Sequence, residues 1–386
     1  MVKKILVFTS TRADYGILYW LIHDLYQENS FDVKLLVSGT HLKKNFGLTY
    51  KEIERDGFTI DLKIPFISPS DTKNGIVRSM ADAMLNYVDA LNTMSPDLII
   101  LLGDRYEALA FAQSAYIMNI PILHLHGGEL TQGAFDEGFR HCITKLSYFH
   151  CVACDGYRKR VIQLGENPNR VFNTGALGLE HIKRCKFKSK QELKEVFKFD
   201  FEKPYILITY HPETFQKMRS SEAIKIILDS LEEFKEFNLV MTYPNIDSGG
   251  NEIIDYLIRY SENNDRVLLV KSFGHDYYHS VVKYSQCVVG NSSSGLIEVP
   301  NLRVSSLNIG DRQGGRLCAK SVIHADLDKA SIIYGVKKCI EITTRPPDNI
   351  FNNPYDSGKS TNMIIDIIKT NNIDLPKSFY DLEVML

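Results

Sequence analysis

Short, mainly apolar runs recur along this chain, and stretches with helical periodicity separate them. Two of the runs, residues 98–102 and 122–125, have the length of strands that are buried on both faces of a sheet. Each run stops abruptly at polar residues. This alternation restricts the chain to an α/β fold with a parallel, doubly wound sheet and right-handed crossovers. We therefore expect ligands to bind beyond the carboxyl ends of the strands.

The strand and helix pattern occurs in both halves of the chain. In the first half we predict strands at residues 3–8, 33–38, 98–102, 122–125, 151–153 and 171–173, and helices at 15–27, 107–118 and 156–164. In the second half we predict strands at 205–209, 239–242, 267–270, 287–289 and 304–307, and helices at 223–236 and 252–260. A lysine-rich helical segment, residues 180–200, separates the halves. We predict two Rossmann-like domains facing a cleft, residues 1–180 and 181–386, with a last helix at 360–371 able to pack back on the first domain.

Composition narrows the kinds of partner. The chain has 45 basic and 47 acidic residues, and a net charge of −2 without a long basic run argues against a nucleic-acid partner. No apolar run reaches the roughly 18 residues of a membrane span, and the first apolar run is too short for a signal peptide. Seven scattered cysteines are typical of reduced thiols, so we expect a cytoplasmic protein. Cys151 and Cys154 have the spacing of a redox or zinc pair, but without a second pair we interpret them as structural.

Acidic and imidazole side chains follow the strands at 98–102 and 122–125. Asp104 comes shortly after the first strand, His126 and Glu129 follow the second, and Asp136 lies a little further on. The carboxyl ends of neighbouring parallel strands meet at one edge of a sheet, so these groups should line one crevice. Carboxylates and imidazoles transfer protons when their pKa values are tuned, which makes this crevice the candidate active site.

Several loops have the residue types that bind phosphate. Residues 9–16 join a strand to a helix and contain Arg12, although an ordinary capped turn with Arg12 in solvent fits equally well. The stretch 290–300, GNSSSGLIEVP, offers small residues, consecutive hydroxyls and a following helix, as a diphosphate requires. The stretch 308–316 adds two guanidinium groups among glycines. His211 ends the first strand of the second half, where we expect it to face the cleft.

Metal and dinucleotide signatures are weak in this sequence. His124, His126 and Glu129 are close in sequence, but no His-Glu-x-x-His helix occurs. No Gly-x-Gly-x-x-Gly follows the first strand either. We therefore expect chemistry by side chains alone, without a metal or a cofactor.

Six motifs in this order resemble the hydrolysing UDP-N-acetylglucosamine 2-epimerases, in particular the bacterial enzymes of sialic acid and capsule synthesis. The motifs are TRADYG (11–16), LGDRYE (102–107), HLHGGELTQGAFDEGFRH (124–141), YHPET (210–214), GNSSSGLIEVP (290–300) and NIGDRQGGR (308–316). The resemblance implies the glycosyltransferase B-type fold, with UDP held mainly by the second domain. It also implies a reaction without metal or NAD. The proton on the carbon bearing the acetamido group is removed, UDP leaves, and water adds to the glycal to give N-acetylmannosamine.

The resemblance also assigns roles to individual residues. The resemblance gives catalytic roles to Asp104, Glu129, Asp136 and His211 and UDP contacts to Arg12, Ser292, Ser293 and Glu298. The residue types and their positions add His126 to the candidate catalytic residues, and Ser294, Arg312 and Arg316 to the candidate UDP-binding residues. His126 departs from a glutamate that non-hydrolysing relatives and some hydrolysing ones carry at this position, so either His126 or Glu129 takes that acid/base role. We expect a homo-oligomer, either a dimer or a tetramer. The alternatives are a 2-epimerase of a UDP-2,4-diacetamido-trideoxyhexose, as in legionaminic acid synthesis, a retaining glycosyltransferase of the same fold, and a UDP-sugar sensor without turnover.

Overall fold

Successive side chains of strand β1 (Lys3–Thr9) pack into two different hydrophobic clusters. Ile5 and Val7 belong to one cluster, whereas Leu6 and Phe8 belong to the other. Because neighbouring side chains on a strand point to opposite faces, both faces of this sheet are buried under helices. The predicted central parallel sheet is therefore present.

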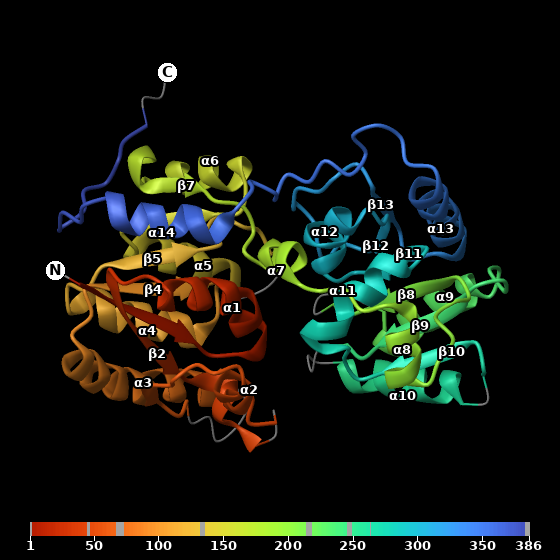
Figure 1. The fold of residues 1–386 in the computed structure, drawn as a ribbon, viewed down its shortest axis with the longest axis horizontal. Helices are drawn as coiled ribbons and strands as arrows, with labels where there is room; N and C mark the ends of the chain where they lie inside the picture. Colours follow the sequence, from red (N-terminus) through yellow and green to blue (C-terminus); the bar gives the residue numbers. More distant parts are fainter. Residues whose placement is uncertain are drawn as a thin grey trace. The chain divides into compact units, whose positions relative to one another are not determined.

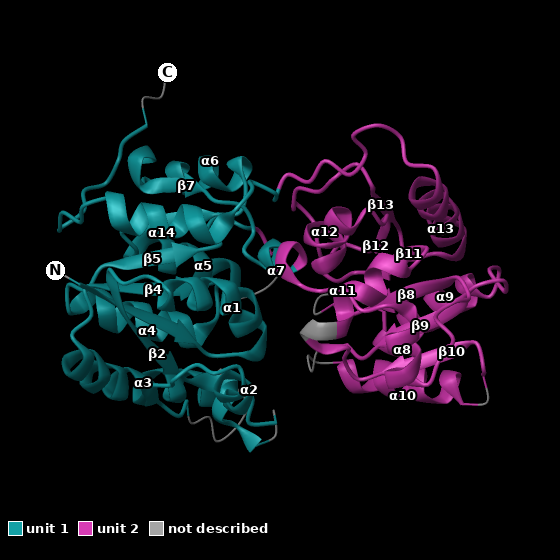
Figure 2. Cartoon of the chain, in the orientation of Figure 1, with its two compact units in different colours: residues 1–129, 135–181, 355–386 teal, residues 130–134, 182–354 magenta. Residues whose placement is uncertain are grey.

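The computed structural model describes residues 2–44, 47–66, 73–131, 136–213, 218–244, 249–262 and 264–382. The chain divides into two compact units, shown in Figure 2. Unit 1 consists of Met1–Glu129, Phe135–His181 and Tyr355–Leu386, and unit 2 of Leu130–Ala134 and Ile182–Pro354. Helix α7 (Gly178–Arg184) contains the main boundary between them.

Unit 1 has one parallel sheet, with the order β3-β2-β1-β4-β5-β6-β7 among its described residues (Figure 1). The other strands are β2 (Phe31–Val37), β3 (Leu62–Lys63), β4 (Leu98–Leu102), β5 (Ile122–Leu125), β6 (Phe149–Val152) and β7 (Val171–Asn173). The helices are α1 (Arg12–Tyr26), η1 (Gly39–Leu42), α2 (Tyr50–Arg55), α3 (Lys73–Met94), α4 (Tyr106–Ile117), α5 (Asp136–Leu146), α6 (Asp155–Gln163), η3 (Pro168–Arg170) and α14 (Ser360–Thr370). One face of the sheet packs against α1 and α14, and the other against α3, α4 and α5.

Unit 2 repeats this architecture with a second parallel sheet, ordered β10-β9-β8-β11-β12-β13 in the part that the structure describes. Its strands are β8 (Tyr205–Thr209), β9 (Asn238–Thr242), β10 (Val267–Val270), β11 (Cys287–Gly290), β12 (Ser306–Ile309) and β13 (Val322–Ala325). Its helices are α8 (Lys190–Phe197), α9 (Ser220–Leu231), α10 (Gly250–Ser261), α11 (Gly274–Tyr284), α12 (Ser294–Ile297), η4 (Val299–Leu302) and α13 (Lys329–Thr344). Helices α9, α10 and α13 cover one face, and α8 and α11 the other.

The predicted architecture of two α/β domains, each built on a parallel sheet, is confirmed. The prediction omitted strands β3 and β13 and helices α2, α3, α5, α11 and α13. It also placed β2, β6 and β12 two residues from their observed positions at one or both ends. Cys151 and Cys154 are both buried, and burial raises the pKa of each thiol, so neither is a ready thiolate.

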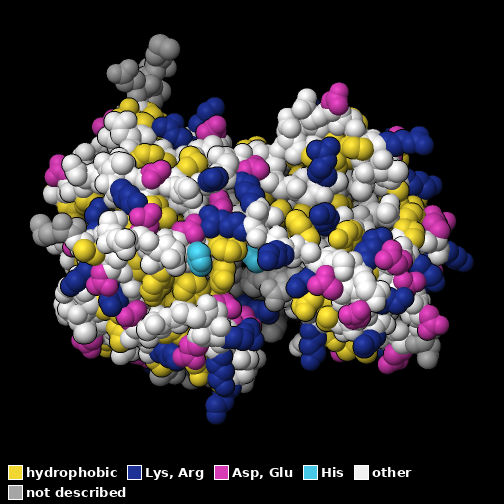
Figure 3. Space-filling model, in the orientation of Figure 1, with side chains coloured by type: hydrophobic (Ala, Val, Ile, Leu, Met, Phe, Trp, Pro, Cys, Tyr) yellow, Lys and Arg dark blue, Asp and Glu magenta, His cyan; other side chains and the backbone are white. Residues whose placement is uncertain are grey.

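Two further features of the described residues are the apolar character of the helices and the distribution of surface charge. Among the described residues, no helix combines the length and the apolar character that crossing a membrane requires. Basic and acidic side chains are interspersed over the face shown in Figure 3.

Candidate active site

The turn after β4 carries Asp104 out of the sheet. Gly103 takes a positive φ of 83°, and its N–H donates to the carbonyl of Leu125 on the neighbouring strand (3.1 Å). The Gly103 carbonyl in turn accepts from Nε2 of His124 (2.8 Å). Because a carbonyl only accepts, His124 carries its proton on Nε2, and its Nδ1 accepts from the Thr144 hydroxyl (3.1 Å). Burial lowers the pKa of His124 to about 3, so this ring is neutral and shapes the turn.

A buried guanidinium holds Asp104 in place. Arg140, on the second turn of α5, is only 1% exposed, and its Nη2 donates to the Asp104 carboxylate. Its Nη1 donates to the Glu129 carbonyl (2.8 Å) and to the Glu137 carboxylate (3.2 Å). Burial alone would lower the pKa of Arg140, but the surrounding carboxylates raise it. Arg140 therefore stays charged and fixes Asp104, the Glu129 backbone and the start of α5 relative to one another.

His126 and Glu129 form a hydrogen-bonded pair. Nδ1 of His126 lies 2.8 Å from Oε1 of Glu129, and Nε2 accepts from the backbone N–H of Leu177 (3.4 Å). The Leu177 donor places the imidazole proton on Nδ1, which therefore donates to the carboxylate. His126 has a φ of 63°, a left-handed conformation that is uncommon for a residue with a side chain. The two groups whose roles the sequence left open thus share one proton path, and strain of this kind is frequent at functional sites.

Asp136 is the first residue of α5, and Glu137 follows it in the same turn. The Asp136 side chain is half-buried. The four residues before it, 132–135, lie outside the described part of the chain. Asp104, His126, Glu129 and Asp136 thus come from β4, β5 and α5 of unit 1, and the first three join in one network around Arg140.

The turn before α1 is occupied by its own acid. The carboxylate of Asp14 accepts from the backbone N–H groups of Ser10 (2.9 Å), Thr11 (2.8 Å) and Tyr15 (2.8 Å). Arg12 turns to Glu52 on α2, with Nε 3.0 Å from the carboxylate. The amide donors that a phosphate would use at this helix start are thus engaged by Asp14, which favours the capped turn over a phosphate site at the backbone.

In unit 2, Asn291 ties three strand ends together. Its Oδ1 accepts from the His211 N–H (2.7 Å) after β8, and its Nδ2 donates to the His211 carbonyl (2.9 Å). Its own carbonyl accepts from Arg312 (3.1 Å) and Gln313 (2.9 Å) after β12. Asn291 is 0% exposed. Burial, and secondarily the Arg312 charge, lowers the pKa of His211 to about 3, so its imidazole is neutral.

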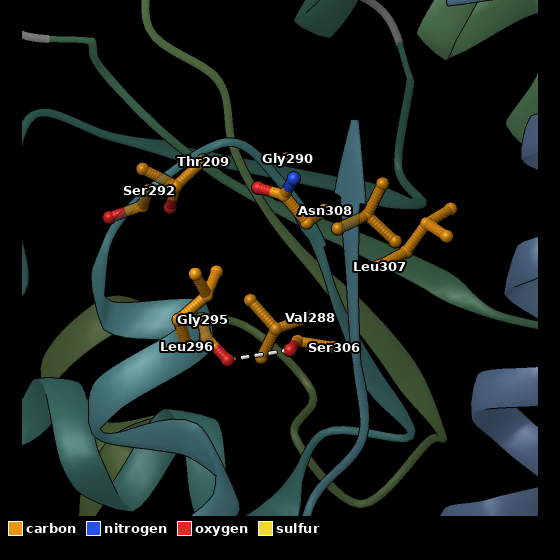
Figure 4. A pocket seen from close by; sticks show the side chains of 10 residues that line it. Thr209, Val288, Gly290, Ser292, Gly295, Leu296, Ser306, Leu307 and Asn308 are labelled. Carbon is orange, nitrogen blue, oxygen red and sulfur yellow. Dashed lines mark hydrogen bonds between the residues drawn. The ribbon is translucent and has the colours of Figure 1, made fainter. Parts of the chain in front are cut away.

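Gly290 makes this junction possible. Its φ of 144° is open to glycine alone, and a Cβ built there would lie 1.9 Å from the Thr209 carbonyl oxygen. The following hydroxyl run begins at Ser292, which with Thr209 lines a hollow of about 10 Å³, shown in Figure 4. In that view Ser306 donates to the Gly295 carbonyl (2.6 Å). This bond fixes α12 against β12.

Ser293 and Ser294 start the short helix α12, and Glu298 ends it. Ser294 donates to the Glu298 carboxylate (2.6 Å) and accepts from the Tyr278 hydroxyl (2.9 Å). Glu298 also lies 3.5 Å from Nε2 of His279. The Ser294 hydroxyl is therefore engaged by Glu298, whereas Ser292 lines the hollow of Figure 4.

The loop after β12 carries both predicted arginines. Arg316 donates through Nε to the Leu130 carbonyl (3.1 Å), and Arg312 lies against Asn291. A polar pocket of about 550 Å³ opens beside this loop, lined in part by Asp311, Arg316 and His324. Its volume suits a small ligand.

The sequence matches the family described as UDP-N-acetylglucosamine 2-epimerase over residues 23–369. The chain belongs to this family.

Similar proteins from bacteria span most or nearly all of the chain. GDP/UDP-N,N'-diacetylbacillosamine 2-epimerase (hydrolyzing) of Campylobacter jejuni is 39% identical over 85% of this chain and 86% of its own length. Polysialic acid biosynthesis protein P7 of Escherichia coli is 36% identical over 98% of both chains. UDP-N-acetylglucosamine 2-epimerase of Neisseria meningitidis is 29% identical over 99% of this chain and 100% of its own.

Solved structures of epimerases share the fold. UDP-GlcNAc 2-epimerase from Neisseria meningitidis bound to UDP-GlcNAc superposes with a TM-score of 0.79 at 18% identity, covering 95% of this chain and 100% of that one. The Methanocaldococcus jannaschii UDP-GlcNAc 2-epimerase in complex with UDP-GlcNAc and UDP gives 0.77 at 17% identity, with coverage of 95% and 100%. The fold of the epimerase family is thus present in both units.

Two residues central to the geometry were absent from the predicted site set. Arg140 lies within the motif at 124–141 and Asn291 within the motif at 290–300, but neither residue is assigned a role there. A signal for Asn291 existed, because an amide that follows a buried strand and precedes hydroxyls is well placed to bridge strand ends. Nothing in the sequence marked Arg140 as the arginine that turns inward.

Proposed function

We propose that this protein is a hydrolysing 2-epimerase of a UDP-activated 2-acetamido sugar. The observation that carries the proposal is the network around Arg140, which gathers Asp104, Glu129 and His126 at the carboxyl ends of β4 and β5. Family membership supplies the reaction type. The proposed roles of the individual side chains follow from their chemistry.

The proposed reaction has two stages. A base on the enzyme removes the proton from the carbon that bears the acetamido group, and the bond from C1 to the diphosphate oxygen breaks, releasing UDP and leaving a glycal. Water then adds its hydroxyl to C1, and an acid on the enzyme returns a proton to C2 from the opposite face. The products are UDP and the free 2-epimeric sugar, which balance the UDP-sugar and one water.

We assign the proton transfers to unit 1. Asp104 and the His126–Glu129 pair each present a carboxylate or imidazole that can carry one proton, and Asp136 adds a further carboxylate. In the pair, Glu129 accepts from Nδ1 of His126, and we propose that Nε2 takes up a second proton after it releases the N–H of Leu177, which lies 3.4 Å away. We therefore propose a joint role, with the imidazole as the proton carrier and Glu129 as its partner.

We assign UDP recognition to unit 2. Arg312 and Arg316 supply charge for the diphosphate, and Ser292, Ser293 and Glu298 supply donors and acceptors for phosphate and ribose. His211, neutral because burial lowers its pKa to about 3, serves as a hydrogen-bonding group rather than as a cation. Arg12, engaged with Glu52, remains a candidate whose side chain is long enough to exchange partners.

Two sugars are candidates, each favoured by an observation. The first is N-acetylglucosamine, which would yield N-acetylmannosamine for sialic acid synthesis, in line with the family description and the 36% identity to the polysialic acid protein. The second is N,N'-diacetylbacillosamine, in line with 39% and 32% identity to two enzymes named for that substrate. Incubation with each UDP-sugar in D₂O, with UDP release and C2 deuterium measured by NMR, separates them. If the protein releases no UDP and incorporates no deuterium with either sugar, the proposal is overturned.

Substitution at the two ends of β4 tests the site itself. Asp104→Asn should lower turnover by about 10²–10⁴-fold, the usual contribution of a general acid or base, with UDP affinity nearly unchanged. Asp97→Asn is the matched control, because Asp97 precedes the same strand, is exposed, and accepts only from the backbone of Lys4 (2.7 Å). Equal losses in the two variants would contradict the assignment.

A further inference from the structure

Glu166 is a buried carboxylate with three cationic or imidazole partners outside the candidate active site. It is 1% exposed and lies in the loop after α6. Lys145 contacts it at 2.5 Å, His150 at 3.0 Å and Lys377 at 2.8 Å. These partners come from α5, β6 and the C-terminal segment. The carboxylate thus joins the consecutive elements α5 and β6 to the C-terminal segment, whose Lys377 lies 211 residues further along the chain.

The C-terminal segment 374–380, here called the strap, runs along this cluster. The Asp374 N–H donates to the Tyr148 hydroxyl (2.9 Å), and Lys377 donates a second bond to the Ser147 carbonyl (2.6 Å). Further on, the Tyr380 N–H donates to the Gly165 carbonyl (3.0 Å). Gly165 also faces the Phe379 ring so closely that a built Cβ would lie 2.1 Å from it. The strap is therefore attached by backbone, side-chain and ring contacts.

The charge of Lys377 is costly to bury. Its side chain is 12% exposed, and burial lowers its pKa to about 8 although Glu166 opposes that shift. A buried ion pair commonly adds no net stability over an apolar pair of the same volume, and its best-attested use is to fix one arrangement among several. The contacts of Lys377 fix the position of the residues that follow α5.

Helix α5 connects this cluster to the candidate active site. Its first turn carries Asp136, its second turn carries Arg140, and its last turn carries Lys145. This 11-residue helix is about 16 Å long, and its backbone hydrogen bonds connect its last turn rigidly to its first turn. Lys377 and Glu166 hold the end of this helix. Lys377 donates to the carbonyl of Ser147 directly after the helix, and Glu166 accepts from Lys145 in its last turn.

We propose that Lys377 and Glu166 are positioning residues for the epimerisation: they set the place of α5, and so of Asp136 and Arg140 at its other end. This inference rests on the proposed function for its activity readout. It adds the C-terminal strap to the parts of the chain that determine turnover. A displacement of about 1 Å at a proton-transfer group is enough to slow a reaction by about 10²-fold.

The test is Lys377→Met in the full-length protein. Methionine keeps the apolar volume and removes the charge. We expect kcat for the UDP-sugar to fall at least tenfold, while KM and UDP affinity by calorimetry stay within twofold. Lys369→Met is the control, because Lys369 lies on α14 in an exposed pair with Glu28 (2.6 Å) and should leave kcat unchanged.

Hydrogen exchange provides a readout that is independent of turnover. In Lys377→Met the amides of α5 should exchange at least tenfold faster, whereas those of α1 stay protected. Lys377→Arg, which restores the charge, should recover both kcat and protection, and it keeps the test decisive if the methionine variant folds poorly. Wild-type kcat and wild-type α5 exchange in Lys377→Met would overturn the proposal. If the wild-type protein turns over no UDP-sugar, the proposed function fails while the exchange result still decides the role of the strap.

Discussion

Replacing Asn291 with alanine should destabilise unit 2 selectively. The substitution removes both side-chain bonds to the His211 backbone, at 2.7 and 2.9 Å. Asn291 is 0% and His211 7% exposed, so water cannot replace these bonds without rearrangement. Each orphaned backbone group costs about 1–3 kcal/mol, which gives a loss of about 2–6 kcal/mol. That is a large part of the about 5–15 kcal/mol that stabilises an ordinary domain.

The chain offers a built-in way to assign the loss to one unit. Its single tryptophan, Trp20, lies on α1 of unit 1, so tryptophan fluorescence reports that unit. In urea, the circular dichroism transition of Asn291→Ala should begin at a lower concentration than in the wild type, and the fluorescence transition should stay where it is. Turnover should also fall about 10²-fold, because His211 loses its fixed position.

Asn238→Ala is the matched control for this experiment. Asn238 starts β9 in the same unit, is similarly buried, and makes one weak bond to the Asp200 carbonyl (3.5 Å). We expect it to lose less than about 1 kcal/mol. The reasoning about Asn291 is refuted if both variants unfold alike, or if the Trp20 signal of Asn291→Ala shifts by the same amount as the dichroism.

Two further predictions concern backbone strain and pH. Gly290→Ala should prevent unit 2 from folding, seen as loss of soluble protein, because the new Cβ would overlap the Thr209 carbonyl. Gly57→Ala is the control, because Gly57 also has a positive φ, 90°, but open space around it, and this variant should stay soluble. Burial alone would raise the pKa of Glu166, but its imidazole and ammonium partners lower it to about 2 from its usual 4.5. Its contribution of about 3 kcal/mol is therefore present above pH 4.5 and lost as pH falls toward 2. The stability difference between wild type and Glu166→Gln, followed by Trp20 fluorescence, should shrink over that interval, and a constant difference would contradict the assignment.

The sequence predicted elements best where an apolar run has polar residues at both ends. The predicted strands at 98–102 and 122–125 coincide with β4 and β5 for that reason. Helix α3 was missed because its apolar residues do not form a single stripe. Val77 and Leu85 are 67% and 72% exposed, while Tyr87 and Leu91 of the same helix are buried. An apolar surface that stays exposed obscures the periodicity from which helices are predicted.

The same distinction applies to the site. Strand ends and residue types indicated where Asp104, His126 and Glu129 would gather, because the carboxyl edge of a parallel sheet is a property of the topology. The bonds that organise them were not predictable. Arg140 reaches Asp104 from 36 residues away, and Asn291 reaches His211 from 80. Which of many arginines or asparagines turns inward depends on packing among distant segments, and local patterns carry no information about that.

Unit 1 includes residues 355–386, which follow the residues 182–354 that form most of unit 2. During synthesis, the part of unit 2 that follows residue 181 leaves the ribosome before unit 1 has its last helix and strap. Until then, the apolar residues that share a hydrophobic cluster with α14, including Leu18 and Leu25 of α1, lack this helix as a packing partner. A stop codon shortly after residue 354 would thus remove part of unit 1, the first unit to be translated, and would leave unit 2 with all of its residues.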